Sequence, residues 1–84
     1  MSVVNGLIYE ALQKAGIAFE PQDILNADMD LDRVYFNIKN EPKDYIIRMW
    51  NIGAKEVEYS LYKDNDRGGA DELTSGVYNY AKTE

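Results

Sequence analysis

Residues 33–64 read RVYFNIKNEPKDYIIRMWNIGAKEVEYSLYKD, and this segment decides the fold. In three stretches, residues 33–38, 45–52 and 56–63, successive residues divide between two faces, and Val34, Ile47 and Leu61 belong to the apolar one, which is the period-two pattern of half-buried β-strands. The stretches are separated by residues 39–43, where Pro42 ends strand pairing, and by a short connection that contains Gly53. The segment therefore predicts a three-stranded antiparallel meander.

The alternation also assigns two faces to this sheet. One face carries the apolar residues of the core, and the other carries Arg33, Tyr35, Ile46, Arg48, Trp50, Glu58 and Tyr62. Tyr, Trp and Arg are enriched at interaction hot spots, and an exposed aromatic patch usually marks a contact surface. We therefore predict that Tyr35, Trp50 and Tyr62 contact a partner and that Arg48 orients it. If the register slips by one residue, or if helices cover both faces, this set belongs to the core instead.

Outside this segment, one helix is clear at the N-terminal side. Apolar residues of residues 3–15 recur at helical spacing, and Gly16 stands where a helix commonly ends. Residues 17–27 are expected to form a loop with one irregular turn near Pro21, from which Phe19, Ile24 and Leu25 reach the core.

The C-terminal side predicts a second helix over residues 70–82. Ala70, Leu73, Val77 and Ala81 keep helical spacing, although residues 77–80 also suit a short strand. The expected fold is thus α+β in the order α-β-β-β-α: a three-stranded antiparallel meander with helices packed on one face, in a single domain of residues 1–84.

Composition excludes several classes of function. The 84 residues include no Cys and no His, which removes disulfides, thiolate nucleophiles and zinc ligation by these side chains. A net charge of -6 argues against direct binding to nucleic acid or to an anionic membrane. No apolar run reaches the roughly 18 residues of a membrane span, and Glu10 interrupts any signal-peptide core. We expect a cytoplasmic protein.

An acidic run precedes the first strand. In NADMDLDRVYF, residues 26–36, Asp28, Asp30 and Asp32 match the first three ligand positions of an EF-hand loop. Arg33 stands at the position of the tight-turn glycine and Lys39 at that of the bidentate glutamate, so no calcium site is expected. If the strand begins near residue 30, Asp30 and Asp32 continue the face of Val34. These carboxylates are expected to steer a basic partner toward the sheet.

A second acidic group surrounds a glycine-rich loop. Asp64 and Asp66 precede Gly68 and Gly69, and further carboxylates follow, but Arg67 would repel a cation. A turn leading into a helix is the favoured interpretation, with a divalent-cation site as the competing one. No metal and no cofactor is expected. If the two acidic groups converge in space, they form a patch that imitates a phosphate backbone.

No catalytic arrangement is present in the sequence. It contains no Ser-His or Cys-His constellation, no phosphate-binding loop and no G-x-G-x-x-G motif, so we do not expect an enzyme. The sequence favours a small acidic interaction protein that binds another protein, basic or nucleic-acid-binding, through the aromatic face. In size, charge and lack of catalytic groups alone it is similar to phage inhibitors of the anti-CRISPR and anti-restriction kind. The alternative is a structural or accessory protein that forms a homodimer through the same face.

Overall fold

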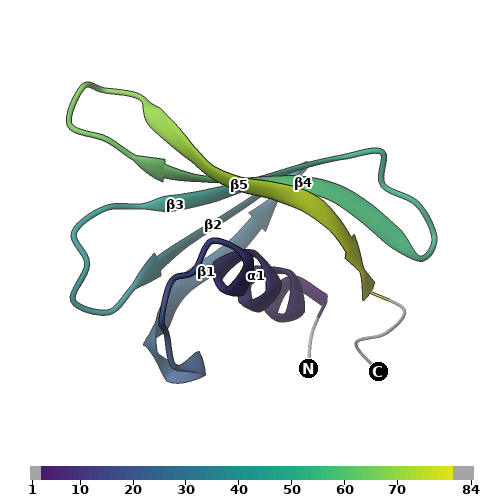
Figure 1. The fold of residues 1–84 in the computed structure, drawn as a ribbon, viewed down its shortest axis with the longest axis horizontal. Coiled ribbons are helices and arrows are strands. Elements are labelled where there is room, and N and C mark those ends of the chain that lie inside the picture. The colour runs from purple at the N-terminus through teal and green to yellow at the C-terminus, as the bar shows by residue number, and fades with distance from the viewer. Residues whose placement is uncertain (1–2, 81–84) are drawn as a thin grey trace.

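The computed structural model describes residues 3–80, which form one α-helix and a five-stranded antiparallel sheet (Figure 1). Helix α1 spans Val3–Lys14, and a short 3-10 helix spans Pro21–Asp23. The strands are β1 (Ile24–Asp30), β2 (Arg33–Ile38), β3 (Tyr45–Trp50), β4 (Glu56–Asp64) and β5 (Ala70–Asn79). They lie in the sheet in chain order, so β1 and β5 are its two edges.

Helix α1 packs against one face of the sheet, and no other element of residues 3–80 covers the opposite face (Figure 1). The core lies between the helix and the face that it covers, called the inner face below. Its buried residues are Leu7, Ile8, Ala11, Leu12, Val34, Phe36, Ile38, Tyr45, Ile47, Met49, Val57, Tyr59, Leu61 and Tyr78. Because burial of apolar area drives folding, sealing this face with α1 stabilises a chain of this size.

Several sequence-based predictions are confirmed. The class is α+β, α1 lies on one face, and the three central strands have the predicted alternation, with Val34, Ile47 and Leu61 buried. Phe19 and Ile24 pack against the core as expected.

The predicted α-β-β-β-α order is wrong, because the meander has a further strand on each side. Residues 70–79 form β5 and not a helix, and residues 24–30 form β1 and not a loop. The part of the helix prediction that covers residues 81 and 82 lies outside the described residues. Leu25 was expected in the core but is 42% exposed.

Strand β5 is held mainly by its pairing with β4. The two strands pair from Glu56 opposite Asn79 to Asp64 opposite Ala70, with one shift of register between Leu61 and Tyr62. Tyr78 is the one buried residue of β5, so the sequence of this strand shows little alternation of apolar residues. The helical spacing of its apolar residues arises by chance and is the stronger pattern. Gly76 leaves room for the end of the flexible Lys14 side chain, which would have to shift to admit a Cβ atom at this position.

Strand β1 is also an edge, and it is almost entirely exposed. Its carboxylates Asp28 and Asp30 suit an edge strand, because charges discourage pairing with another chain. A bulge lies between Leu25 and Asp28, where Asn26 has a φ of 57°. Asp32 belongs to the β1–β2 turn, so the prediction that Asp30 and Asp32 share the face of Val34 is wrong.

Each hairpin connection contains one residue in the left-handed region. Asn40 (φ 70°) and Asn51 (φ 49°) supply it on either side of β3, and Gly68 (φ 81°) supplies it before β5. Asn and Gly adopt this conformation at low cost, whereas Leu31 (φ 57°) does so in the β1–β2 turn against the ordinary preference of a leucine. The Leu31 side chain is 86% exposed.

Two core tyrosines differ in how their hydroxyl groups are satisfied, and this predicts opposite effects of Tyr→Phe. The Tyr45 hydroxyl donates a 2.6 Å hydrogen bond to Glu41, whereas the Tyr59 hydroxyl is buried and has no hydrogen bond of good geometry among residues 3–80; its interaction with the Glu10 carboxylate adds to burial in raising the pKa of Tyr59. Tyr45→Phe is expected to lower the free energy of unfolding by about 1 kcal/mol, and Tyr59→Phe to leave it unchanged or raise it by up to about 1 kcal/mol. Urea unfolding of both variants measures this; equal losses would contradict it.

Candidate functional site

The face of the sheet opposite α1, called the outer face, is organised in rows of side chains that cross the strands. Directly opposed residues in an antiparallel sheet project from the same face. The arginine row consists of Asp30, Arg33, Arg48, Ser60 and Ser75, from β1 to β5. The tyrosine row consists of Asp28, Tyr35, Ile46, Tyr62 and Glu72 in the same strand order. The outer face therefore has a basic and aromatic centre with carboxylates at its edges.

All four residues predicted to bind a partner lie on the outer face. Tyr35, Arg48 and Tyr62 belong to the two central rows, and Trp50 lies one row further along β3, opposite Glu58. Trp50 is 42% exposed, which is unusual for so large an apolar side chain. The structure thus brings the predicted set together on one surface.

A cavity of about 280 Å³ lies at the centre of this face. It is lined by Arg33, Ile46, Arg48, Tyr62 and Ala70. Two arginines therefore share one cavity with an isoleucine, an alanine and a tyrosine. This combination suits a ligand group that is negatively charged at one end and apolar at the other.

The two arginines of the cavity are directly opposed on β2 and β3. Like charges in this position repel each other, so the pairing does not serve stability. Arg33 has partners: contact with the Tyr35 hydroxyl raises the pKa of Arg33, with smaller contributions from Asp32 and Asp30. The Arg33 Nε lies 4.0 Å from an Asp32 carboxylate oxygen.

Arg48 differs from Arg33, since its side chain is exposed and forms no hydrogen bond or ion pair with any other residue between positions 3 and 80. Its guanidinium carries donors that no protein group uses in this part of the chain. Next to it, Ser60 is buried at 3% exposure although no helix covers the outer face within residues 3–80. The neighbouring side chains therefore close over the middle of the row and leave Arg48 at its surface.

The sequence-based site lacked three residues that line the cavity. Arg33 and Ile46 were assigned to the outer face but not to the site, and Ala70 was placed on a helix. Arg33 could have been included in the predicted site, because the length of the β2–β3 connection sets the register that places Arg33 opposite Arg48. Ala70 carries no such signal, because its position depends on the pairing of β5.

The two acidic groups do not converge. Asp28 and Asp30 lie on edge strand β1 and Asp32 in the adjoining turn, whereas Asp64 ends β4 and Asp66 follows it near the opposite edge. Four strand spacings separate the two edges, about 19 Å. The groups also lie toward opposite ends of the strands, so they do not form the single acidic patch that the sequence allowed.

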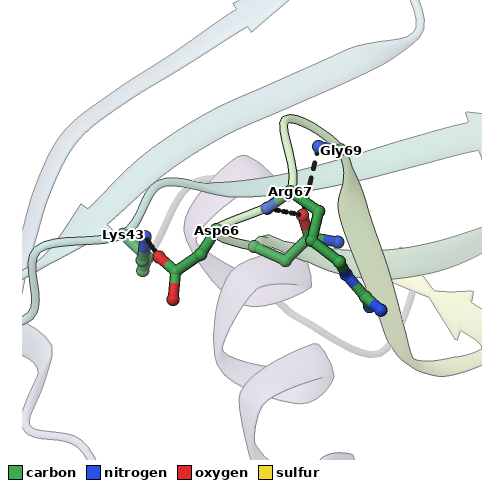
Figure 2. Close-up of polar contacts among 5 residues, drawn as sticks. Lys43, Asp66, Arg67 and Gly69 are labelled. Carbon is green, nitrogen blue, oxygen red and sulfur yellow. Dashed lines mark hydrogen bonds and ion pairs between the residues drawn. The ribbon is translucent and has the colours of Figure 1, made fainter.

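Two carboxylates at the β4–β5 loop, those of Asp66 and Asp71, have local partners. Figure 2 shows Asp66 in an ion pair with Lys43, and the backbone amides of Arg67 and Gly69 donating to the Asn65 side chain at 2.8 and 3.1 Å. The Asn65 side chain in turn donates to Asp71. Within residues 3–80, no group of three or more Asp or Glu side chains is placed to hold a metal ion.

The Lys43–Asp66 contact predicts a titration effect. The hydrogen bond and charge of Lys43 lower the pKa of Asp66. Any stability from this contact is present above the unfolded-state pKa and is lost as the pH falls through the folded-state pKa. Lys43→Gln is expected to return the pKa of Asp66 to its ordinary value, as measured by the pH dependence of its ¹³C carboxyl shift. Lys39→Gln, which removes the same charge from the same connection, is expected to change it little; equal effects would contradict a specific contact.

A second exposed apolar surface lies at the end of the molecule that contains the N-terminus of α1. Val3, Met29 and Ile52 are exposed there at 48%, 51% and 60%. They line a cavity of about 180 Å³ together with Val4, Leu7, Val34, Met49, Val57 and Tyr80. We call this surface the apolar end. Among residues 3–80, no charged side chain lines its cavity, so no described charge would fix the orientation of a ligand there.

No helix within residues 3–80 has the length and apolar character needed to cross a membrane. Comparison of the chain with protein-family models, with curated proteins and with solved structures gave no match.

Proposed function

We propose that this protein is a non-enzymatic binding module that holds another protein against its outer face. The observation that carries the proposal is the central cavity, where the Arg48 side chain, which has no partner among residues 3–80, lies beside Tyr62 and Arg33 on a face that no described element covers. Arg, Tyr and Trp are the side chains that dominate binding energy at protein interfaces. Trp50, one row away, supplies the large apolar anchor.

The net charge supports a partner with a basic surface. Asp28 and Asp30 at one edge of the outer face, and Glu72 at the other, would attract it and speed its association. Such a module acts as an inhibitor if the surface that it covers is one a nucleic-acid-binding protein needs. The separation of the acidic groups favours direct contact through the centre of the face over imitation of a phosphate backbone, which would need continuous negative charge.

Site-specific cross-linking tests the proposal, and the absence of cysteine from the chain makes single-cysteine variants selective. Ser75→Cys places a thiol-attached photo-cross-linker at the end of the arginine row, and Gln13→Cys places it on the exposed side of α1. In an extract of the native cells, Ser75→Cys is expected to cross-link to one specific protein and Gln13→Cys is not. Cross-linking of that protein only from Gln13→Cys would contradict the proposal.

The alternative is a homodimer through the same face. A two-fold axis through its centre would stack the Arg33–Arg48 pair on its own copy, which like-charge repulsion opposes. Analytical ultracentrifugation separates the two proposals. A monomer at tens of micromolar excludes the homodimer, whereas a tight dimer that shields Trp50 fluorescence from quenchers would assign the outer face to self-association.

A further inference from the structure

The arginine pair specifies what the partner must carry. We propose that the cavity between Arg33 and Arg48 is a receptor for a carboxylate of the partner protein, with the aliphatic part of that acidic residue against Ile46, Tyr62 and Ala70. This inference rests on the proposed function and adds the chemistry of the contact to it.

The fork geometry of guanidinium groups supports a carboxylate. An arginine can donate two parallel N–H groups to the two oxygens of one carboxylate, and such charged hydrogen bonds are the strong ones at interfaces. Arg48 has no partner of its own among the described residues, so it loses no internal contact when it binds. Arg33 is held from the side by Tyr35 and Asp32, which orients it beside the cavity.

The local charge balance favours a single negative charge over a phosphate chain. Asp32 and Asp30 already offset the charge of Arg33, whereas no ion pair within residues 3–80 offsets the charge of Arg48. A carboxylate matches one charge. A polyanion crossing the face would also meet Asp28 and Asp30 at one edge and Glu72 at the other, and these would repel it.

The carboxylates at the two edges of the outer face indicate what the rest of the partner surface carries. Around the carboxylate, basic groups of the partner would face the carboxylates of β1 and β5. The occupant is therefore a protein surface with one acidic residue at the centre of a basic region. This arrangement fits a partner of opposite overall charge without placing like charges together.

A peptide titration tests the receptor without the natural partner. The probe is acetyl-Gly-Leu-Glu-Gly-amide, whose only charge is one carboxylate, and the matched control is the isosteric acetyl-Gly-Leu-Gln-Gly-amide. Binding to the full-length protein is followed by ¹H–¹⁵N spectra that include the arginine Nε–H signals. The glutamate peptide is expected to shift Arg33 and Arg48 Nε–H and the amides of Ile46, Tyr62 and Ala70, and the glutamine peptide is not.

Substitutions of an arginine inside the cavity and of one outside it test whether the cavity binds the peptide. Arg48→Gln is expected to lower the affinity for the glutamate peptide about tenfold or more, because a charged donor is lost. Arg48→Lys is expected to lower this affinity less. Arg67→Gln makes the same change in the β4–β5 loop, where Arg67 lies 3.7 Å from Asp71, and is expected to leave binding unchanged.

Three results would overturn the receptor: equal binding of both peptides, shifts confined to the apolar end, or equal weakening by Arg48→Gln and Arg67→Gln. A phosphoserine peptide that binds more than about tenfold tighter than the glutamate peptide would also overturn it, in favour of a phosphate-bearing partner. Each of these results leaves cross-linking from the Ser75→Cys variant unaffected, so failure of the receptor is distinguishable from failure of the proposed function.

Discussion

Replacement of Leu12 by alanine is expected to lower the free energy of unfolding by about 3 kcal/mol. Leu12 has 0% exposure and belongs to the stripe of α1 that seals the inner face of the sheet. Its truncation removes apolar burial and leaves a cavity that a small core cannot refill. Since a domain of this length has a total stability of about 4 to 12 kcal/mol, the variant loses a large part of it.

Leu31→Ala is the matched control, because the same atoms are removed from a side chain that is 86% exposed. It is expected to change stability by less than about 0.5 kcal/mol. Urea unfolding followed by far-ultraviolet circular dichroism measures both variants. A loss below about 1 kcal/mol for Leu12→Ala would mean that α1 is not the main cover of the inner face.

Trp50→Ala is expected to weaken partner capture by about thirtyfold or more, which corresponds to a hot spot of about 2 kcal/mol. The indole is 42% exposed on the outer face, so it keeps apolar area in water that a partner would bury. The measurement is the affinity for the protein identified by cross-linking, after confirming by circular dichroism that the variant is folded.

Ile52→Ala tests the competing surface. Ile52 is 60% exposed and belongs to the apolar end, whose cavity is lined by no charged side chain from the described part of the chain. Its truncation is expected to leave capture within about threefold of the unsubstituted protein. If Ile52→Ala abolished capture and Trp50→Ala did not, the apolar end would be the contact surface and the outer face would not.

The three central strands and α1 were predictable because their buried residues recur at regular spacing in the sequence. Val34, Ile47 and Leu61 each belong to a run in which every second residue is apolar and buried, since one side of each strand meets the core and the other does not. The same spacing placed Tyr35, Arg48, Trp50 and Tyr62 on one face. Helix α1 follows from the spacing of its buried residues.

The edge strands were not predictable, because their stability comes from backbone hydrogen bonds and leaves little apolar pattern. In β1 no residue is fully buried, and in β5 only Tyr78 is. A strand can join a growing sheet with polar residues on both sides when its neighbour offers free N–H and C=O groups. Helical spacing in residues 70–82 therefore gave the wrong element.

By itself, the sequence determined the class of fold, the helix, the central strands and the residue types of the outer face, because side-chain burial is encoded locally by periodicity. Only the tertiary structure decided which of these residues meet. It opposed Arg33 to Arg48, brought Ala70 to their cavity and set the acidic groups toward opposite edges. The physical reason is that strand pairing is non-local: the register between strands, and the addition of two edge strands, depend on hydrogen bonds that no single segment encodes.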